Sequence, residues 1–208
     1  MVKLAAIVLA AGSGSRFGGA KHDVLLAGRP AWRWSTDLFD EMGIPVILVG
    51  PLPGGVGGGE RRRDSVAAGL DAVPPITTHV LVHDAARPLI SRPLVERIVG
   101  ALEQGAAAVI PAVPVTDTVK RVVEGVVVET IDRTELVSVQ TPQGFAIALL
   151  RRVHEQTDDD VTDDAALVEA AGIPVKVVAG DPENRKITYR ADHYIAEATV
   201  RLRGETDG

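Results

Sequence analysis

The 208-residue sequence contains no cysteine, which excludes disulfide frameworks, thiolate metal sites and cysteine nucleophiles, and fits a reducing compartment. Aromatic residues make up only 3% of the chain, which argues against a surface that stacks single-stranded bases. No apolar run approaches the roughly 20 residues that span a bilayer, and no signal cleavage site follows the first eleven residues. We therefore expect a cytoplasmic protein that binds neither membranes nor nucleic acids.

Apolar residues make up 46% of the chain and charged residues 24%, a mixture typical of a globular protein with a sizeable core. The length favours a single domain over residues 1–208. A formal net charge of -6 disfavours general binding to polyanions. Any anionic ligand must therefore be held by a local group of basic residues.

Strand-like and helix-like patterns alternate along the chain and predict an α/β layer fold. Short apolar runs predict strands at residues 4–9, 46–49, 79–83, 107–111 and 175–178. Helical spacing predicts helices over residues 30–42, 93–104, 145–156, 163–171 and 191–202. A further short helix is predicted to begin with Asp64 or Ser65 as its N-cap and to end at residue 72. Two β-branched runs around Glu124 and Gly125 predict a hairpin that projects from the sheet, and such an arm usually meets a partner.

A glycine-rich turn, LAAGSGSR at residues 9–16, follows the first predicted strand. Glycines let backbone N–H groups approach phosphate oxygens closely. Such turns also occur without a ligand, but the nearby Arg16 and Lys21 favour a phosphate. A Walker A loop is excluded because no Gly-Lys-Ser/Thr follows, and a dinucleotide-binding turn fits poorly because no acidic residue ends the second strand.

A second motif, VHDAARP at residues 82–88, lies at the carboxyl end of the third predicted strand. Ligands bind at that edge of open parallel sheets, so Asp84 is placed for a metal or a ribose and Arg87 for a phosphate, although Asp84 has an alternative role as a cap. We interpret His83 as structural. The arginine run at residues 61–63 precedes Ser65; we expect one or two of the arginines to be solvated, and Ser65 either to cap a helix or to contact a base.

Later hydroxyl and basic residues predict a polar, phosphate-accepting site, although each is commonplace alone. Thr162, before two aspartates, is more often a helix cap than a ligand contact. The residues are Thr118, Arg133, Thr141, Thr162, Lys186 and Thr188.

In this order, the segments VHDAARP, DTVK, Asp132-Arg133, QTPQ-x-F and TDD followed by N-x-K-I-T resemble the 2-C-methyl-D-erythritol 4-phosphate cytidylyltransferase family of the non-mevalonate isoprenoid pathway. The resemblance extends from about residue 7 to residue 198. It implies a Rossmann-like α/β nucleotidyltransferase domain, CTP and Mg²⁺ or another divalent cation. It further implies a homodimer whose hairpin arm, at about residues 118–135, completes the neighbour's site. The implied reaction joins CTP to methylerythritol 4-phosphate and releases pyrophosphate.

The resemblance also implies roles for individual residues. It assigns catalysis to Arg16, Lys21, Asp84 and Lys186, with Asp84 also at the metal. It assigns nucleotide binding to Ala10, Ala11, Gly12, Gly58, Gly59 and Ser65. It assigns binding of the polyol phosphate to Arg87, Thr118, Arg133, Thr141 and Thr162, with Arg133 contributed from the partner subunit.

Three alternatives stay open. A ribitol 5-phosphate cytidylyltransferase would share the nucleotide chemistry, but such enzymes usually have Gly-Gly in place of Ala11-Gly12 and lack the Asp-Arg and Thr-Asp-Asp pieces. A nicotinamide-dependent oxidoreductase would use the glycine turn for its dinucleotide. A regulatory nucleotide-binding module without catalysis is suggested by the unusual loop at residues 20–24.

Overall fold

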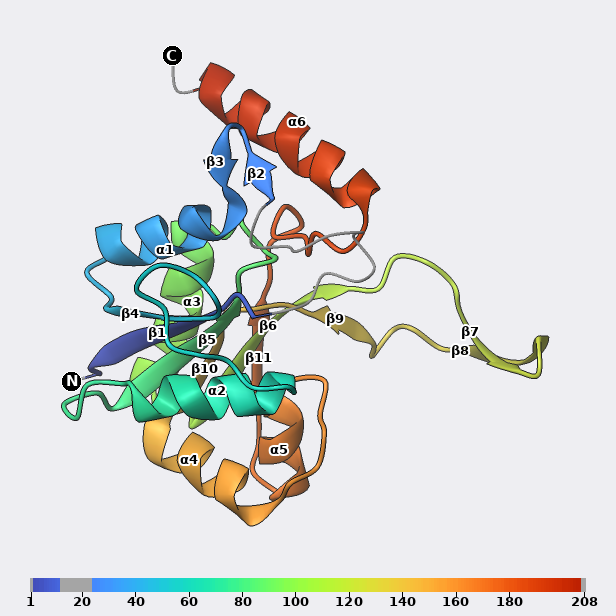
Figure 1. Cartoon of the computed structure of the whole chain (residues 1–208). Helices are drawn as coiled ribbons and strands as arrows, with labels where there is room; N and C mark the ends of the chain where they lie inside the picture. The colour runs from blue at the N-terminus through green and yellow to red at the C-terminus, as the bar shows by residue number, and fades with distance from the viewer. Residues whose placement is uncertain (1, 12–23, 207–208) are drawn as a thin grey trace.

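The computed structural model describes residues 2–11 and 24–206, and a central sheet covered by helices on both faces forms its body (Figure 1). The strand order is β11-β6-β10-β5-β1-β4, with β9 also paired to β6. These strands are β1 (Leu4–Leu9), β4 (Val46–Val49), β5 (His79–Asp84), β6 (Ala108–Pro114), β9 (Val137–Val139), β10 (Gln143–Ala146) and β11 (Lys176–Ala179). β1 is parallel to β4 and β5, and β11 is parallel to β6, whereas β10 runs antiparallel between β5 and β6. The predicted α/β fold with a mostly parallel sheet is confirmed.

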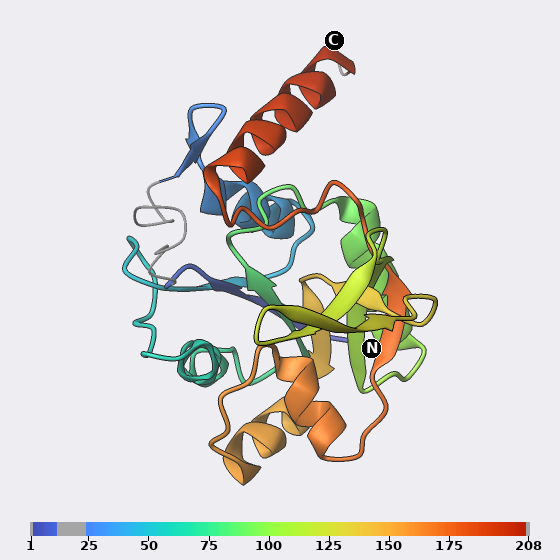
Figure 2. The same ribbon diagram turned by 90° about the vertical axis from the view of Figure 1, so that its right-hand side faces the viewer.

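The sheet is buried on both faces, and β1, which lies between β5 and β4, is apolar on both. Along β1, Ala5 and Ile7 pack into one hydrophobic cluster, whereas Ala6 and Val8 pack into the other. The first cluster lies under α2 (Arg62–Asp71), α4 (Ile147–Gln156) and α5 (Asp164–Ala170), and the second under α1 (Ala31–Glu41) and α3 (Arg92–Glu103). Figure 2 shows the two helical layers on opposite sides of the sheet.

The last helix, α6 (Arg190–Thr206), lies beyond the α1 side and packs against a small ribbon formed by β2 (Leu25–Leu26) and β3 (Arg29–Pro30) (Figure 1). A third apolar cluster, which includes Leu26, Leu89, Ile187 and Ala196, joins these pieces. The backbone N–H of Ala27 also donates to a carboxylate oxygen of α6 at 2.8 Å. The C-terminal helix is therefore attached to the segment that precedes α1.

A two-stranded arm, β7 (Val119–Val123) and β8 (Val126–Ile131), projects away from the body (Figure 1). Its strands pair with each other through a turn at Glu124 and Gly125, whose φ angles of 48° and 81° both lie in the left-handed region. A two-residue turn with this geometry matches the twist of the flanking strands. The predicted hairpin is confirmed.

Some element boundaries differ from the sequence-based predictions. The helix predicted over residues 145–156 begins at Ile147, and residues 145 and 146 belong to β10. Phe145 fills the space beneath α4, and a Cβ on Gly144 would lie 2.8 Å from Ile98 Cγ2 on the other face of the sheet. Helix α2 begins at Arg62, so neither Asp64 nor Ser65 is its N-cap. Asp64 is instead the third helical residue and accepts the backbone N–H of Arg61 at 3.1 Å.

Across residues 2–11 and 24–206, no helix combines the length and the apolar composition that a membrane span requires.

Candidate functional site

Several of the predicted site residues lie where the parallel strands end. β1 and β5 are in register, with Leu9 opposite Asp84, so the segment after β1 begins beside that carboxylate. The backbone N–H of Ala10 donates to Val49 at 2.7 Å, and that of Ala85 donates to Leu9 at 3.0 Å. Ala10 and Ala11 thus begin the predicted nucleotide loop at the edge of the sheet where β1 and β5 end. Gly12, Arg16 and Lys21 lie outside the described residues.

The predicted nucleotide contacts of α2 and its preceding loop pack against Ala11. A Cβ on Gly58 would lie 2.7 Å from the Cβ of Ala11 and 2.9 Å from Ser65 Oγ, so only glycine allows this approach. Ser65 is buried, and its hydroxyl accepts the backbone N–H of Gly59 at 3.1 Å. Ala11, Gly58, Gly59 and Ser65 therefore form one contiguous group.

Asp84 lies between two cations. Lys186 Nζ donates to its Oδ2 at 2.6 Å, and Arg62 Nε donates to its Oδ1 at 3.5 Å. The Asp84 side chain is 14% exposed. Burial alone would raise the pKa of Asp84, but Arg62 and Lys186 hold it well below the usual range. The site thus contains a carboxylate that is ionised at neutral pH, at the edge of the sheet.

A chain of hydrogen bonds fixes the backbone around Asp84. His83 is buried, and its Nε2 lies 3.1 Å from the carbonyl oxygen of Arg87, so this nitrogen is the donor. Nδ1 then accepts the hydroxyl proton of Thr141 at 3.1 Å, and the same hydroxyl accepts the backbone N–H of Asp84 at 3.1 Å. Burial lowers the pKa of His83 to about 4, so the ring is neutral at pH 7. The structural interpretation of His83 fits this geometry, and the hydroxyl of Thr141 is already engaged.

Residues 180–188, which we call the strap, cross this edge after β11. The backbone oxygen of Asn184 accepts Arg87 Nη1 at 2.8 Å, and its side-chain Nδ2 donates to the carbonyl oxygen of Thr141 at 2.8 Å. Arg87 Nη2 also donates to Val139 at 3.2 Å, and burial lowers the pKa of Arg87. The strap therefore holds Arg87, Thr141 and Lys186 close to Asp84.

Three predicted substrate contacts lie elsewhere. Thr118 and Arg133 are exposed at the base of the arm, where Arg133 donates to the carbonyl oxygens of Val115, at 2.8 Å, and of Thr116. Thr162 is exposed before α5, and the N-cap of that helix is Asp163, which accepts the N–H of Ala166 at 3.2 Å. Within the described part of the chain, no hydrogen bond or ion pair links these three side chains to Asp84.

Arg62 is a member of the site that the sequence did not single out. Besides Asp84 it contacts Asp164, with Nη1 2.7 Å from Oδ2, and Asp164 is fully buried. Its two acidic partners are 22 and 102 residues away in sequence, so local spacing gave no signal. The only hint was the run of three arginines.

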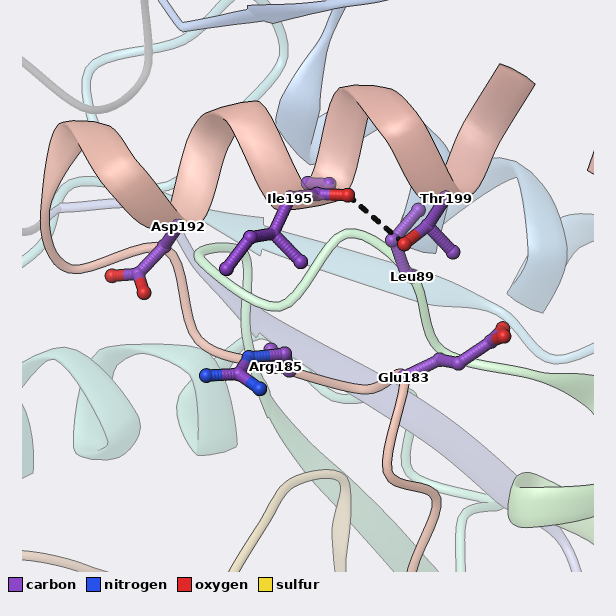
Figure 3. Close-up of a pocket in the computed structure, with 7 residues that line it drawn as sticks. Leu89, Glu183, Arg185, Asp192, Ile195 and Thr199 are labelled. Carbon is purple, nitrogen blue, oxygen red and sulfur yellow. Dashed lines mark hydrogen bonds between the residues drawn. The ribbon is translucent and has the colours of Figure 1, made fainter. Parts of the chain in front are cut away.

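A small pocket lies on the other side of the strap, beneath α6 (Figure 3). Glu183 and Arg185 of the strap line it together with Leu89 and with residues of α6 such as Ile195 and Thr199. None of the predicted site residues that the structure describes lines this pocket. Glu183 and Arg185 of the strap therefore face α6, whereas Asn184 and Lys186 contact residues on the Asp84 side.

A divalent cation fits this site only with help from a ligand. Among the residues that the structure describes, no three acidic or histidine side chains converge as a preformed metal cage. Mg²⁺ is commonly held by one or two carboxylates together with substrate phosphates, and Asp84 supplies one such carboxylate in its ionised form. This donor would suit Mg²⁺ only where phosphate oxygens of a ligand supply further contacts.

The fold and the site together define an α/β protein with a ligand site at the carboxyl ends of its strands, where a glycine-lined loop lies beside a charged cluster. A family model described as 2-C-methyl-D-erythritol 4-phosphate cytidylyltransferase matches residues 4–202. The chain belongs to this family.

Individual relatives agree with that assignment. The chain is 41% identical to the 2-C-methyl-D-erythritol 4-phosphate cytidylyltransferase of Prochlorococcus marinus, over 95% of this chain and 98% of that protein. It is 45% identical to the bifunctional enzyme IspD/IspF of Solidesulfovibrio magneticus, over 89% of this chain but only 54% of that enzyme. Against the corresponding enzyme of Nitratidesulfovibrio vulgaris, the match spans 37% of the relative's length.

A solved structure of this family has the same fold as this chain. The crystal structure of 2-C-methyl-D-erythritol 4-phosphate cytidylyltransferase from Thermus thermophilus matches with a TM-score of 0.82 and 33% identity, over 94% of this chain and 98% of that chain.

Proposed function

We propose that the chain is a CTP-dependent cytidylyltransferase that converts CTP and 2-C-methyl-D-erythritol 4-phosphate to 4-CDP-2-C-methyl-D-erythritol and pyrophosphate, in isoprenoid precursor synthesis. The observation that carries the proposal is the Asp84 carboxylate, held between Lys186 and Arg62 where β1 and β5 end, in a chain of this family. We further propose that it acts in the cytoplasm, with no membrane or nucleic acid as partner.

The proposed reaction is a direct displacement. A phosphate oxygen of the polyol attacks the α-phosphorus of CTP, the bond to the bridging oxygen of the β-phosphate breaks, and pyrophosphate leaves in line. No protein nucleophile is required. The protein's task is to position two polyanions and to supply positive charge where the nonbridging oxygens gain negative charge. We assign the latter task to Arg16 and Lys21, as the family resemblance implies.

We assign different groups of the described residues to the two substrates. The group formed by Ala11, Gly58, Gly59 and Ser65 supplies close backbone contacts for the nucleotide, with the Ser65 hydroxyl holding the backbone of Gly59. Lys186 and Arg87 border Asp84 and supply cations for the polyol phosphate. Asp84 would hold Mg²⁺ together with phosphate oxygens, and the bound ion would neutralise charge on the triphosphate.

The arm supports a homodimer as part of the same proposal. Thr118 and Arg133 are exposed and flank its two strands, no hydrogen bond or ion pair of the described residues links them to Asp84, and valines of the arm are exposed. We propose that these two residues complete the site of a partner subunit.

The test is release of pyrophosphate from CTP by the purified protein with Mg²⁺, comparing methylerythritol 4-phosphate with ribitol 5-phosphate. We expect release with the former, and a fall in kcat of about 10²–10³-fold for Asp84→Asn. A preference for ribitol phosphate, or NADH binding without CTP turnover, would overturn the proposal.

A further inference from the structure

The three consecutive arginines at the start of α2 have different surroundings. Arg61 Nη2 lies 2.8 Å from carboxylate oxygens of both Asp64 and Asp158, at the surface. Arg63 is buried and donates to the backbone oxygens of Asp159 and His154, at 3.0 Å and 2.9 Å. Of the three, Arg62 is the one that turns toward the predicted site, where its Nε faces Asp84.

Arg62 is held from behind by a buried acid. Its Nη1 donates to Asp164 Oδ2 at 2.7 Å, and the other oxygen of that carboxylate accepts His154 Nε2 at 2.9 Å. Burial alone would raise the pKa of Asp164, but His154 and Arg62 lower it, so Asp164 is an anion. A fully buried carboxylate with both oxygens engaged makes a rigid anchor for the guanidinium.

The arrangement is not the most stable one for Arg62 itself. Its Nη2 is buried and has no hydrogen-bond partner among the described residues, and its contact to Asp84 is long at 3.5 Å. A buried donor without a partner destabilises the folded protein. Arg63, by contrast, has no buried side-chain nitrogen without a partner among the described residues.

We propose that Arg62 is a positioning residue for Asp84. Anchored on the Asp164–His154 pair, it faces one carboxylate oxygen while Lys186 binds the other, so that the plane of the carboxylate is fixed between two cations. The inference rests on the proposed function only in taking Asp84 as the carboxylate that serves the reaction. It adds Arg62, Asp164 and His154 to the residues on which catalysis depends.

The kinetic test uses Arg62→Met, Arg62→Lys and, as a matched control, Arg61→Met, which removes the same charge from the neighbouring residue. We expect Arg62→Met to lower kcat by on the order of 10²-fold, as misplacement of a reacting group by about 1 Å does, with the KM for CTP nearly unchanged. Arg62→Lys keeps the charge without the planar fork and should recover part of the rate. Arg61→Met should retain wild-type kcat. Equal kcat values for Arg62→Met and Arg61→Met would overturn the proposal.

A double-mutant cycle tests the anchor. Asp164→Asn should lower kcat although Asp164 contacts no substrate, and it should add little when Arg62 is already Met, because both changes release the same carboxylate. Additive effects on kcat would contradict the proposal. Thermal unfolding of each variant shows whether the protein is folded, and if Arg62→Met does not fold, Arg62→Lys decides.

A crystal structure of Arg62→Met, or of Arg62→Lys, gives a readout that does not depend on turnover. We expect the Asp84 carboxylate to rotate from its position opposite Lys186. An unmoved carboxylate would overturn the inference even if the wild type releases pyrophosphate. Conversely, a wild type without that activity would overturn the proposed function, and the rotation would still decide the role of Arg62.

Discussion

Two ion pairs of nearly equal length lie in opposite surroundings. Arg62 and Asp164 are 2.7 Å apart beside the candidate site, where the Asp164 carboxylate is 0% exposed. Arg121 and Glu129 are 2.8 Å apart across the strands of the arm, with side chains 62% and 53% exposed. The distances are almost the same, but water screens the second pair and not the first. Burial, not separation, decides what each pair contributes.

The same contrast holds for the two regions as a whole. Around Asp84, hydrogen bonds from β5, α2, the strap and the segment before β10 fix the side chains within one chain. The arm has pairing between its own strands, and its valines are exposed. The first region is organised by its own fold, whereas the second presents an apolar surface that suits a partner.

The largest expected effect comes from breaking the buried pair. Asp164→Ala leaves Arg62 and His154 without their shared acceptor, and we expect the free energy of unfolding to fall by about 3–5 kcal/mol. Urea denaturation at pH 7.5 measures the change. A loss below about 1 kcal/mol, the range of exposed pairs, would remove the distinction between the two regions.

The next effect concerns pH and the buried ring of His83. Its pKa falls from 6.5 to about 4 on folding, so between these values the unfolded chain binds a proton that the folded chain does not. Stability therefore rises with pH across this window and is lost as pH falls, by at most about 3 kcal/mol. We expect urea midpoints to decrease from pH 7.5 to pH 4.5.

The control for this prediction is His83→Gln, which cannot titrate. Neighbouring charges such as Asp84 and Arg87, and the other histidines, remain in that variant. The difference between the two pH profiles thus isolates the ring. Identical profiles would show that His83 titrates normally in the folded protein.

The arm should respond in association rather than in folding. Val126→Glu combined with Val128→Glu places two charges on its exposed apolar surface, and we expect the dissociation constant of the proposed dimer to rise by about two orders of magnitude. Sedimentation velocity over a concentration series measures it. Val177→Glu, at an exposed valine of β11, is the control and should leave association unchanged. A monomeric wild type would refute the dimer.

The smallest effect belongs to the exposed pair. Arg121→Ala removes its contact with Glu129 in high dielectric, and we expect less than about 1 kcal/mol of change in unfolding free energy. Thermal unfolding in 0.05 M and 0.5 M salt checks this, because the small contribution should shrink further at high salt. A loss comparable with that of Asp164→Ala would contradict the comparison.

The sequence predicted the parts of the fold that depend on local patterns. The apolar run of β1 and the Glu124-Gly125 turn have signals within a few residues, and both appear where expected. β10 was missed because Gln143 and Gly144 carry no strand pattern, and only the gap between β5 and β6 makes them extended. The start of α2 was missed because Arg61 is an unusual N-cap.

For the site, too, the sequence predicted the residues that have a local signal and missed one that depends on tertiary contacts. Asp84 followed from its place after an apolar strand, and the structure brings Lys186 to it across 102 residues. Arg62 was not identified, because nothing near it in sequence distinguishes it from Arg61 or Arg63. Its role depends on Asp164, which reaches it from another helix of the same layer. Contacts of this kind follow from tertiary packing and not from spacing.

The direction of one short strand has a further consequence. β10 opposes both of its neighbours, so the chain enters it from the side of the sheet at which β5 finishes. Thr141, two residues ahead of β10, therefore meets the backbone of Asp84. Were β10 reversed, that threonine would arrive at the far rim, and the ring of His83 would lose the hydroxyl that now orients it. The direction of this four-residue strand thus determines which loop lies beside Asp84.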